Sequence, residues 1–176
     1  MTFKELTAAR YSVRQYKDKP VEKDTLAAIL EAGRIAPTAG NRQPQRILAV
    51  TEPAGLEKID RCTGCRFGAP AVLVVCYDKN ECWVRKYDGA KSGEADASIV
   101  TTHLMYQAVE LGLGTLWVMF FDPAKLVEEF AIPDNLVPVS LLILGYPADN
   151  AAPADRHFQR HPTEKILSWE KLSQAY

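Results

Sequence analysis

Two apolar stretches constrain the fold of this chain more than any other feature. Residues 71–77 (AVLVVCY) are apolar without alternation, which is typical of a fully buried β-strand. Residues 92–111 open with a Ser-Gly-Glu helix start, and Ala, Ile, Val, Leu and Met occupy much of the circumference of the predicted helix. The chain is therefore expected to combine a buried strand with a long central helix.

The other elements are predicted from periodicity and from start and stop signals. Thr2 and Glu5 form a capping box, which opens a short first helix. Asp122 and Pro123 supply an N-cap followed by Pro at the first helical position. Together the signals predict helices near 3–9, 22–36, 92–111 and 122–130, strands near 46–51, 71–77, 115–121 and 137–144, and a short amphipathic end near 166–169.

Length, charge and hydropathy limit the class of protein. A chain of 176 residues fits a single domain, residues 1–176, with a sizeable core. The formal net charge of -1 argues against nucleic acid as a partner, because no basic stripe is present to neutralise a phosphate backbone. No apolar run approaches the ~20 residues of a bilayer span, and residues 1–5 lack signal-peptide features. We therefore expect a cytoplasmic protein with no membrane partner.

Two polar segments carry the candidate chemistry. Arg10–Arg14 (RYSVR) brings two arginines and a hydroxyl within five residues, and guanidinium groups fit phosphate oxygens with paired donors. Residues 36–44 (APTAGNRQP) place Pro, Gly and side-chain amides directly before a predicted strand. The first segment predicts an anion cradle, and the second predicts a polar loop held at the edge of a rigid element.

Other common sites are not legible in the sequence. Gly112 and Gly114 match the first two glycines of a dinucleotide-binding fingerprint, but Trp117 stands where the third belongs, and the segment runs from helix to strand instead of strand to helix. His103 lies inside the long helix, where a hydrogen-bonded core or interface residue is expected. The three histidines lack the spacing of metal ligands. No NAD-binding domain, ATP-binding domain or metal site is predicted.

These segments together resemble the nitroreductase family of FMN-dependent oxidoreductases. The family signature combines an early Arg-x-Ser-x-Arg with a later Pro-Ser/Thr-x-x-Asn-x-Gln-Pro, which residues 10–14 and 37–44 match. Residues 112–117 (GLGTLW) and 144–147 (LGYP) also look like family segments, and the resemblance extends to about Trp169. It implies an α+β fold with a mostly antiparallel central sheet flanked by helices. Alternation of helices and strands alone would instead suggest a parallel, doubly wound sheet.

The resemblance further implies a bound FMN and an interlocked homodimer in which the C-terminal tail adds to the partner's sheet. The basic cluster near the C-terminus matches the family in Arg160, whereas His161 replaces a usual second base and supplies less permanent charge. The residues that the resemblance assigns to FMN are Arg10, Tyr11, Ser12, Arg14, Pro37, Thr38, Asn41, Gln43, Trp117, Val118, Met119, Arg160 and His161.

The implied activity passes electrons from NADH or NADPH through flavin N5 to a small-molecule acceptor, such as a nitroaromatic or a quinone, in a ping-pong cycle. The cofactor carries this chemistry, so no catalytic side chain is assigned. Residues 78–93, with Trp83, Arg85 and Tyr87, are expected to form a short lid over the substrate, although surface aromatics in a loop are an alternative. Other readings are a specialised enone reductase, a flavin-fragmenting enzyme, a flavin-binding module without useful turnover, and a non-flavin interaction domain.

The cysteines leave several roles open. Cys62 and Cys65 form a C-x-x-C pair, but Cys76 and Cys82 are spaced too widely to complete a zinc site. The pair can be incidental, can line a redox or flavin site, or can bind a metal. Cys76 lies in the buried strand, where an apolar thiol is expected.

Overall fold

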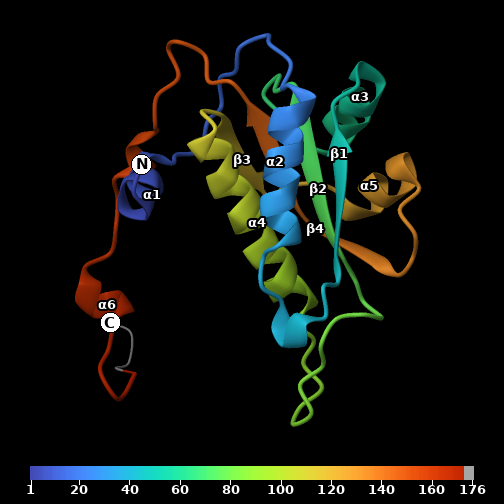
Figure 1. Cartoon of the computed structure of the whole chain (residues 1–176), viewed down its shortest axis with the longest axis vertical. Helices are drawn as coiled ribbons and strands as arrows, with labels where there is room; N and C mark the ends of the chain where they lie inside the picture. Colours follow the sequence, from blue (N-terminus) through green and yellow to red (C-terminus); the bar gives the residue numbers. More distant parts are fainter. Residues whose placement is uncertain (173–176) are drawn as a thin grey trace.

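The computed structural model describes residues 1–172 and contains one four-stranded sheet with helices on both faces (Figure 1). Helices α2 and α4 lie on one face of the sheet, and α1 lies beside α4. Helices α3 and α5 lie on the other face. Helix α6 belongs to the C-terminal arm, residues 146–172, which follows β4. The bounds are α1 Phe3–Ala9, α2 Lys23–Arg34, η1 Ala39–Asn41, β1 Gln45–Val50, α3 Pro53–Cys62, β2 Ala71–Asp78, α4 Gly93–Glu110, β3 Gly114–Val118, α5 Pro123–Phe130, β4 Leu136–Gly145, η2 Asp155–His157 and α6 Thr163–Ile166.

The sheet is antiparallel throughout, with strand order β1-β2-β4-β3. Strand β4 lies between β2 and β3 and pairs with both, placing Ala71 opposite Leu144 and Gly114 opposite Gly145. The strands that precede and follow α4 in the chain, β2 and β3, do not pair with each other, because β4 lies between them. The α+β fold implied by the family resemblance is therefore confirmed, and the doubly wound alternative is wrong.

Strand β2 is buried on both faces, as its unbroken apolar run predicts. Leu73 and Val75 face a core shared with α2 and α4, while Val72 and Val74 face a second core shared with α3 and α5. All four side chains are fully buried. One strand thus joins two hydrophobic layers, and burial of apolar area on both sides makes it the centre of the fold.

Most predicted elements are present, and the N-terminal capping box has the expected geometry. Glu5 N–H donates to Thr2 Oγ1 over 3.3 Å, while Thr2 N–H donates to a Glu5 carboxylate oxygen over 2.7 Å. Asp122 accepts from Lys125 N–H over 3.1 Å at the start of α5. No helix among residues 1–172 has the length and apolar character needed to cross a bilayer.

Two local features differ from the sequence predictions. Helix α3 was not predicted, although Pro53 at its first turn is a usual start signal and Ile59 is fully buried. Strand β3 ends at Val118 instead of continuing to Phe121. The chain turns away there because Phe120, 82% exposed, accepts a 2.6 Å hydrogen bond from Thr63 Oγ1 through its carbonyl instead of pairing in the sheet.

Helix α4 packs closely on β2 at its first residue. A Cβ built on Gly93 would lie 2.2 Å from two ring carbons of Tyr77, far inside van der Waals contact. Glycine at this position therefore allows the start of the central helix to approach the sheet.

We expect Gly93→Ala to lower the free energy of unfolding by about 1–3 kcal/mol, because the added methyl displaces the Tyr77 ring. Urea denaturation followed by circular dichroism measures the change. Gly64→Ala is the matched control, since no heavy atom lies within 4 Å of its added Cβ; it should stay within about 0.5 kcal/mol of the parent. Equal effects of the two substitutions would contradict the close packing.

Candidate functional site

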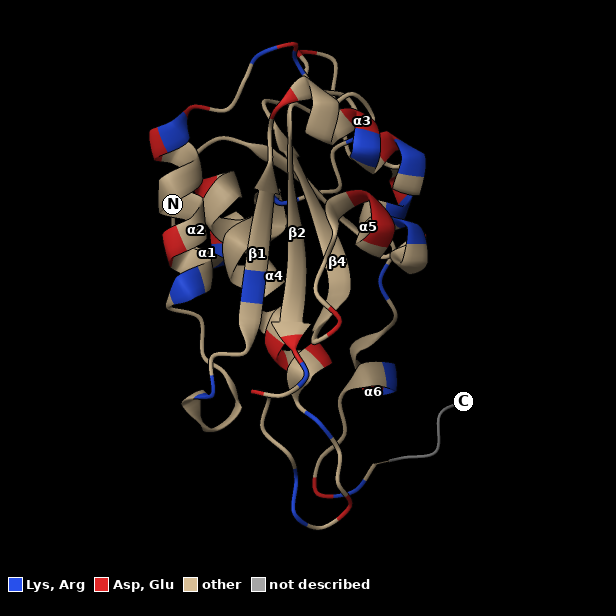
Figure 2. Cartoon of the chain, turned by 90° about the vertical axis from the view of Figure 1, so that its right-hand side faces the viewer, with Lys and Arg blue, Asp and Glu red and all other residues tan. Residues whose placement is uncertain are grey.

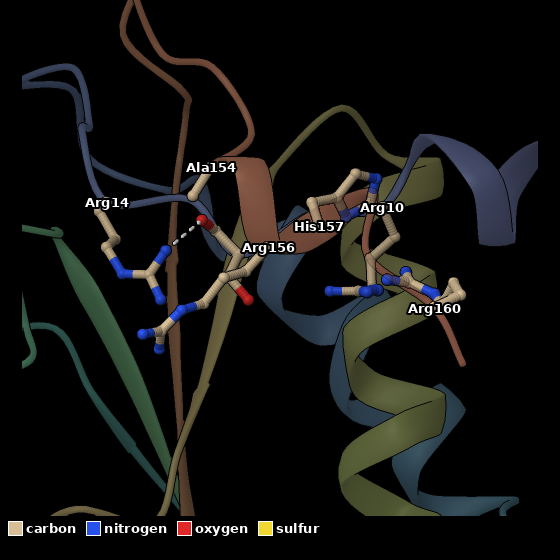
Figure 3. A pocket seen from close by; sticks show the side chains of 7 residues that line it. Arg10, Arg14, Ala154, Arg156, His157 and Arg160 are labelled. Carbon is tan, nitrogen blue, oxygen red and sulfur yellow. Dashed lines mark hydrogen bonds between the residues drawn. The ribbon is translucent and has the colours of Figure 1, made fainter.

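Four arginines from two distant parts of the chain line one cleft of about 510 Å³ (Figure 3). Arg10 and Arg14 follow α1, whereas Arg156 and Arg160 belong to the C-terminal arm. Figure 3 shows the guanidinium groups of Arg10 and Arg160 at one end of the cleft and those of Arg14 and Arg156 at the other. The lining residues are Arg10, Ser12, Arg14, Ala154, Arg156, His157 and Arg160. The structure thus brings the predicted anion cradle together with the predicted Arg160.

The turn that carries Arg10 and Arg14 is anchored to the sheet from below. Ser12 forms a parallel bridge with Thr115, and Val13 N–H donates to the Thr115 carbonyl over 2.9 Å. Tyr16 Oη donates to the Val13 carbonyl over 2.9 Å. Burial raises the pKa of Tyr16, so its hydroxyl keeps the proton that it donates. Because the buried Val13 fixes the backbone here, the polar residues on either side of it are free to face the cleft.

Tyr11 ties the opposite wall to this turn. Its hydroxyl donates to the Ala151 carbonyl over 3.2 Å, and its ring packs edge-on against His157 with centroids 6.4 Å apart. The short helix η2 then presents Arg156 and His157 to the cleft. His161 is exposed and does not line the cleft, so the histidine at the cleft is His157. No local pattern in the sequence distinguishes the two; the contact with Tyr11 does.

The charge of the cleft is one-sided. Within residues 1–172, no carboxylate lines it and none of its four arginines forms an ion pair. Two of them donate only to nearby main-chain carbonyls, Arg14 to Ser12 over 3.2 Å and Arg160 to Gln159 over 2.7 Å. Most guanidinium donors therefore remain available, which is the arrangement that binds a phosphate group.

The second predicted segment forms a tight, strained loop around η1. Asn41 and Gln43 have φ of 52° and 50°, a left-handed conformation that is uncommon for residues other than glycine. Gln43 N–H donates to Thr38 Oγ1 over 3.0 Å, which closes the loop, and Pro37 precedes it on the surface. The loop thus holds its amide side chains exposed at the edge of β1.

Asp96 in the first turn of α4 anchors this loop to the core. It is 2% exposed, and its carboxylate accepts from Ala39 N–H over 2.8 Å and from Ser92 Oγ over 2.6 Å. Ser92 Oγ in turn accepts from Trp83 N–H over 3.1 Å. One buried carboxylate therefore connects the 37–43 loop with the segment that was expected to form a lid. In the sequence, Asp96-Ala97-Ser98 resembles a family segment and also fits an ordinary helix start, and nothing in it indicates the contact with the 37–43 loop.

The predicted ring-binding residues Trp117, Val118 and Met119 lie at the far end of β3 from the cleft. Thr115 at the start of this edge strand contacts the 10–14 turn, and Val118 lies roughly 10 Å further along at about 3.3 Å per residue. Trp117 Nε1 and Thr115 Oγ1 are buried without a hydrogen-bond partner within the described part of the chain. Met119 is 69% exposed. A ligand held by its phosphate in the cleft can therefore reach these residues along β3.

The 37–43 loop lies apart from the arginine cleft within one chain. Its anchor Asp96 is near the start of α4, whereas the turn from α4 into β3 is at the other end of this helix (Figure 1). About 20 Å of helix separate Asp96 from Leu111 at about 1.5 Å per residue. The structure therefore groups the predicted residues into two separate sets.

The expected lid, residues 78–93, is a hairpin that projects from the body of the molecule (Figure 1). Val84 pairs with Lys91 at its base, and Tyr87 near its tip is 84% exposed. Arg85 donates to both carboxylate oxygens of Asp88, over 2.8 and 2.6 Å. Trp83 lies against the 37–43 loop, since a Cβ on Gly40 would be 3.3 Å from its ring. Trp83 is thus the member of the expected substrate set that adjoins the loop.

The remaining candidates take structural positions. All four cysteines are free, burial raises the pKa of Cys62, and burial raises that of Cys76 to about 11. His103 Nδ1 lies 2.9 Å from the Ile99 carbonyl in its own helix. Within residues 1–172, no three His, Cys, Asp or Glu side chains form a group that could hold a metal ion.

Comparison with known proteins identifies the family of this chain. The chain belongs to the nitroreductase family, whose model matches residues 7–146. A nitroreductase family protein of Clostridium difficile strain 630 is 44% identical, with a TM-score of 0.92 covering 98% of this chain and 100% of that one. The FMN reductase (NAD(P)H) of Bacillus subtilis strain 168 is 32% identical over 98% of this chain and 78% of its own length.

A more distant solved structure has the same fold. The FMN-dependent nitroreductase of Clostridium difficile R20291 is 25% identical, with a TM-score of 0.76, and the match covers 95% of this chain and 98% of that one. The family resemblance inferred from the two arginine and loop motifs is therefore confirmed.

We expect Asp96→Ala to loosen the 37–43 loop, because the Ala39 N–H and the Ser92 hydroxyl lose their buried acceptor. An unsatisfied buried donor costs about 1–3 kcal/mol, so amide exchange at Ala39 should accelerate at least about tenfold. Hydrogen–deuterium exchange measures it. Asp96→Asn keeps one acceptor oxygen and should have a smaller effect, and the exposed Glu94→Ala controls for charge in the same turn. Unchanged exchange in Asp96→Ala would show that the loop is held by other contacts.

Proposed function

We propose that this protein is an FMN-dependent NAD(P)H oxidoreductase that passes electrons to small-molecule acceptors such as quinones and nitroaromatics. The observation that carries the proposal is the cleft with four arginines and no carboxylate, placed at one end of a strand whose other end carries the predicted ring-binding residues. Family membership and the FMN reductase relative support the same activity.

The residues present fit FMN in both charge and length. The phosphate is a dianion at neutral pH, and the cleft offers it Ser12 and the four guanidinium groups without an opposing acid. The roughly 10 Å from Thr115 to Val118 is comparable to the span from the phosphate to the flavin ring. Trp117 Nε1 gives this region a buried donor that no group among residues 1–172 satisfies.

FMN, when bound, supplies the hydride and electron chemistry, so the protein needs to provide position and electrostatics. The cleft residues hold the phosphate end, and the main chain around Val118 and Met119 borders the ring. The donor and the acceptor would use one cleft in turn, which predicts ping-pong kinetics. The projecting hairpin offers few contacts on a small acceptor, which favours broad acceptor use over tight specificity.

A homodimer would bring the two separate residue sets together. The 37–43 loop and the arginine cleft of one chain are separated by most of α4, which is longer than FMN. A second copy can place its loop beside the ring that the first copy holds. The C-terminal arm also exposes large apolar side chains that a partner could cover, namely Phe158, Ile166, Leu167, Trp169 and Leu172.

The purified protein should be yellow with a flavin absorbance band, dimeric by light scattering, and reduced by NADH or NADPH under anaerobic conditions. Stopped-flow loss of the flavin band measures the reduction, and quinone added afterwards should restore it. Initial rates at several acceptor concentrations should give parallel double-reciprocal lines. Intersecting lines would refute the shared cleft. A protein that binds FMN but is reduced by neither nucleotide would be a flavin-binding module. A protein that does not bind FMN would be neither an FMN-dependent oxidoreductase nor a flavin-binding module.

Arg10→Ala should weaken FMN binding more than Arg14→Lys does. Hydrogen bonds to charged groups contribute roughly 1.5–3 kcal/mol each, and lysine keeps the charge while losing the paired donors of arginine. The dissociation constant of FMN from deflavinated protein, followed by fluorescence quenching, should rise about tenfold or more for Arg10→Ala. Lys23→Ala removes an exposed charge elsewhere and should have no effect. If both arginine variants bind FMN as tightly as the parent does, the FMN phosphate does not bind in this cleft.

A further inference from the structure

A second concentration of positive charge surrounds the 37–43 loop, away from the arginine cleft. Lys and Arg segments occur in the turn beside the lower end of β1, in β1 itself and along the hairpin (Figure 2). Four exposed cations of this region form no ion pair within residues 1–172: Arg42, Lys79, Lys86 and Lys91. We call these four residues the cationic end.

Two exposed acids of this region are already paired. Glu81 accepts from Arg46 over 2.6 Å, and Asp88 holds Arg85 through two hydrogen bonds. Neither carboxylate is left to neutralise the cationic end. Within residues 1–172, the four residues of the cationic end therefore outnumber the exposed acids without an ion pair nearby, Glu94 and Asp134, even though the whole chain carries a formal charge of -1.

Arg42 is the best positioned member of the cationic end. It lies between Asn41 and Gln43 in the strained loop, and its Nε donates to the Glu81 carbonyl over 3.2 Å. This bond holds the guanidinium group while leaving its two terminal nitrogens without a partner in the described chain. An open hollow of about 520 Å³ adjoins it, lined by Gly40, Asn41, Arg42, Gln43 and Glu81. A held guanidinium beside an open hollow is suited to an anionic group on a bound molecule.

We infer that the cationic end binds the 2′-phosphate of NADPH and makes NADPH the preferred electron donor. The inference rests on the proposed function, in which the 37–43 loop borders the flavin ring across the dimer. A nicotinamide bound at that ring would lie beside Asn41 and Gln43, and we place the adenosine half over their neighbour Arg42 and the hairpin. NADPH differs from NADH only in the phosphate on this half. Arg42 and Lys86 are the residues that recognise it.

The test compares the two nucleotides in the FMN-loaded dimer. Stopped-flow reduction should give a second-order rate constant at least about tenfold higher for NADPH than for NADH, as charge-assisted hydrogen bonds to one phosphate imply. Arg42→Ala and Lys86→Ala should each lower this NADPH-to-NADH ratio severalfold, and the double variant should bring it near unity. Added salt should lower the ratio in the parent by screening exposed charges.

Lys23→Ala is the matched control, because it removes one exposed positive charge at the other end of α2. It should leave the ratio at the parent value. The FMN absorbance of every variant should match the parent, which shows that the fold and the cofactor are retained. A parent ratio of one or below, or an equal loss of rate with both nucleotides in Arg42→Ala, would overturn the inference.

A binding probe separates failure of the inference from failure of the proposed function. Adenosine 2′,5′-bisphosphate should bind the FMN-loaded parent in calorimetry, more tightly than adenosine 5′-monophosphate, and Arg42→Ala should weaken only the former. Reduction by neither nucleotide would refute the proposed function, while this titration would still decide on the cationic end. If the variants instead slow reoxidation by a carboxylate-bearing quinone and leave the nucleotide ratio unchanged, the patch serves an acidic acceptor and the inference is wrong.

Discussion

Packing of α4 against the sheet is the interaction on which the rest of this structure depends. Val100 and Leu104 of this helix are fully buried against β2 and β4, and the close approach at Gly93 places its first turn against Tyr77. The first turn also holds the 37–43 loop through Asp96. The far end of the helix leads into β3, on which the 10–14 turn is seated. One helix therefore sets the separation between the two halves of the candidate site.

Function in this protein depends on how charge is distributed more than on how much charge it carries. Most of the exposed arginines outside the site are paired, as Arg34 is with Glu31 and Arg61 with Glu129. Within residues 1–172, the arginines of the cleft and the four residues of the cationic end are not. Because surface ion pairs contribute little to stability, leaving these groups unpaired costs the fold little and keeps them available to anionic ligands.

Sequence reasoning recovered the parts of the site that lie within short segments. Residues 10–14 and 37–44 each carry their chemistry in one continuous stretch, so their composition was sufficient to single them out. It assigned His161, whereas the structure places His157 at the cleft through a ring contact with Tyr11 made across most of the chain. Arg42 also escaped notice, since its exposure beside an open hollow is a property of the loop conformation and of the Glu81 carbonyl that holds it.

The sequence by itself determined the buried strand, the central helix and the two polar segments, because apolar periodicity, capping residues and turn chemistry are local properties. Only the tertiary structure decided that β4 inserts between β2 and β3, which makes the sheet antiparallel. It also decided that the arginines of both chain ends share one cleft while the 37–43 loop lies about a helix length away. Strand order and the distance between loops arise from packing that joins distant residues, and no single segment of the chain encodes them.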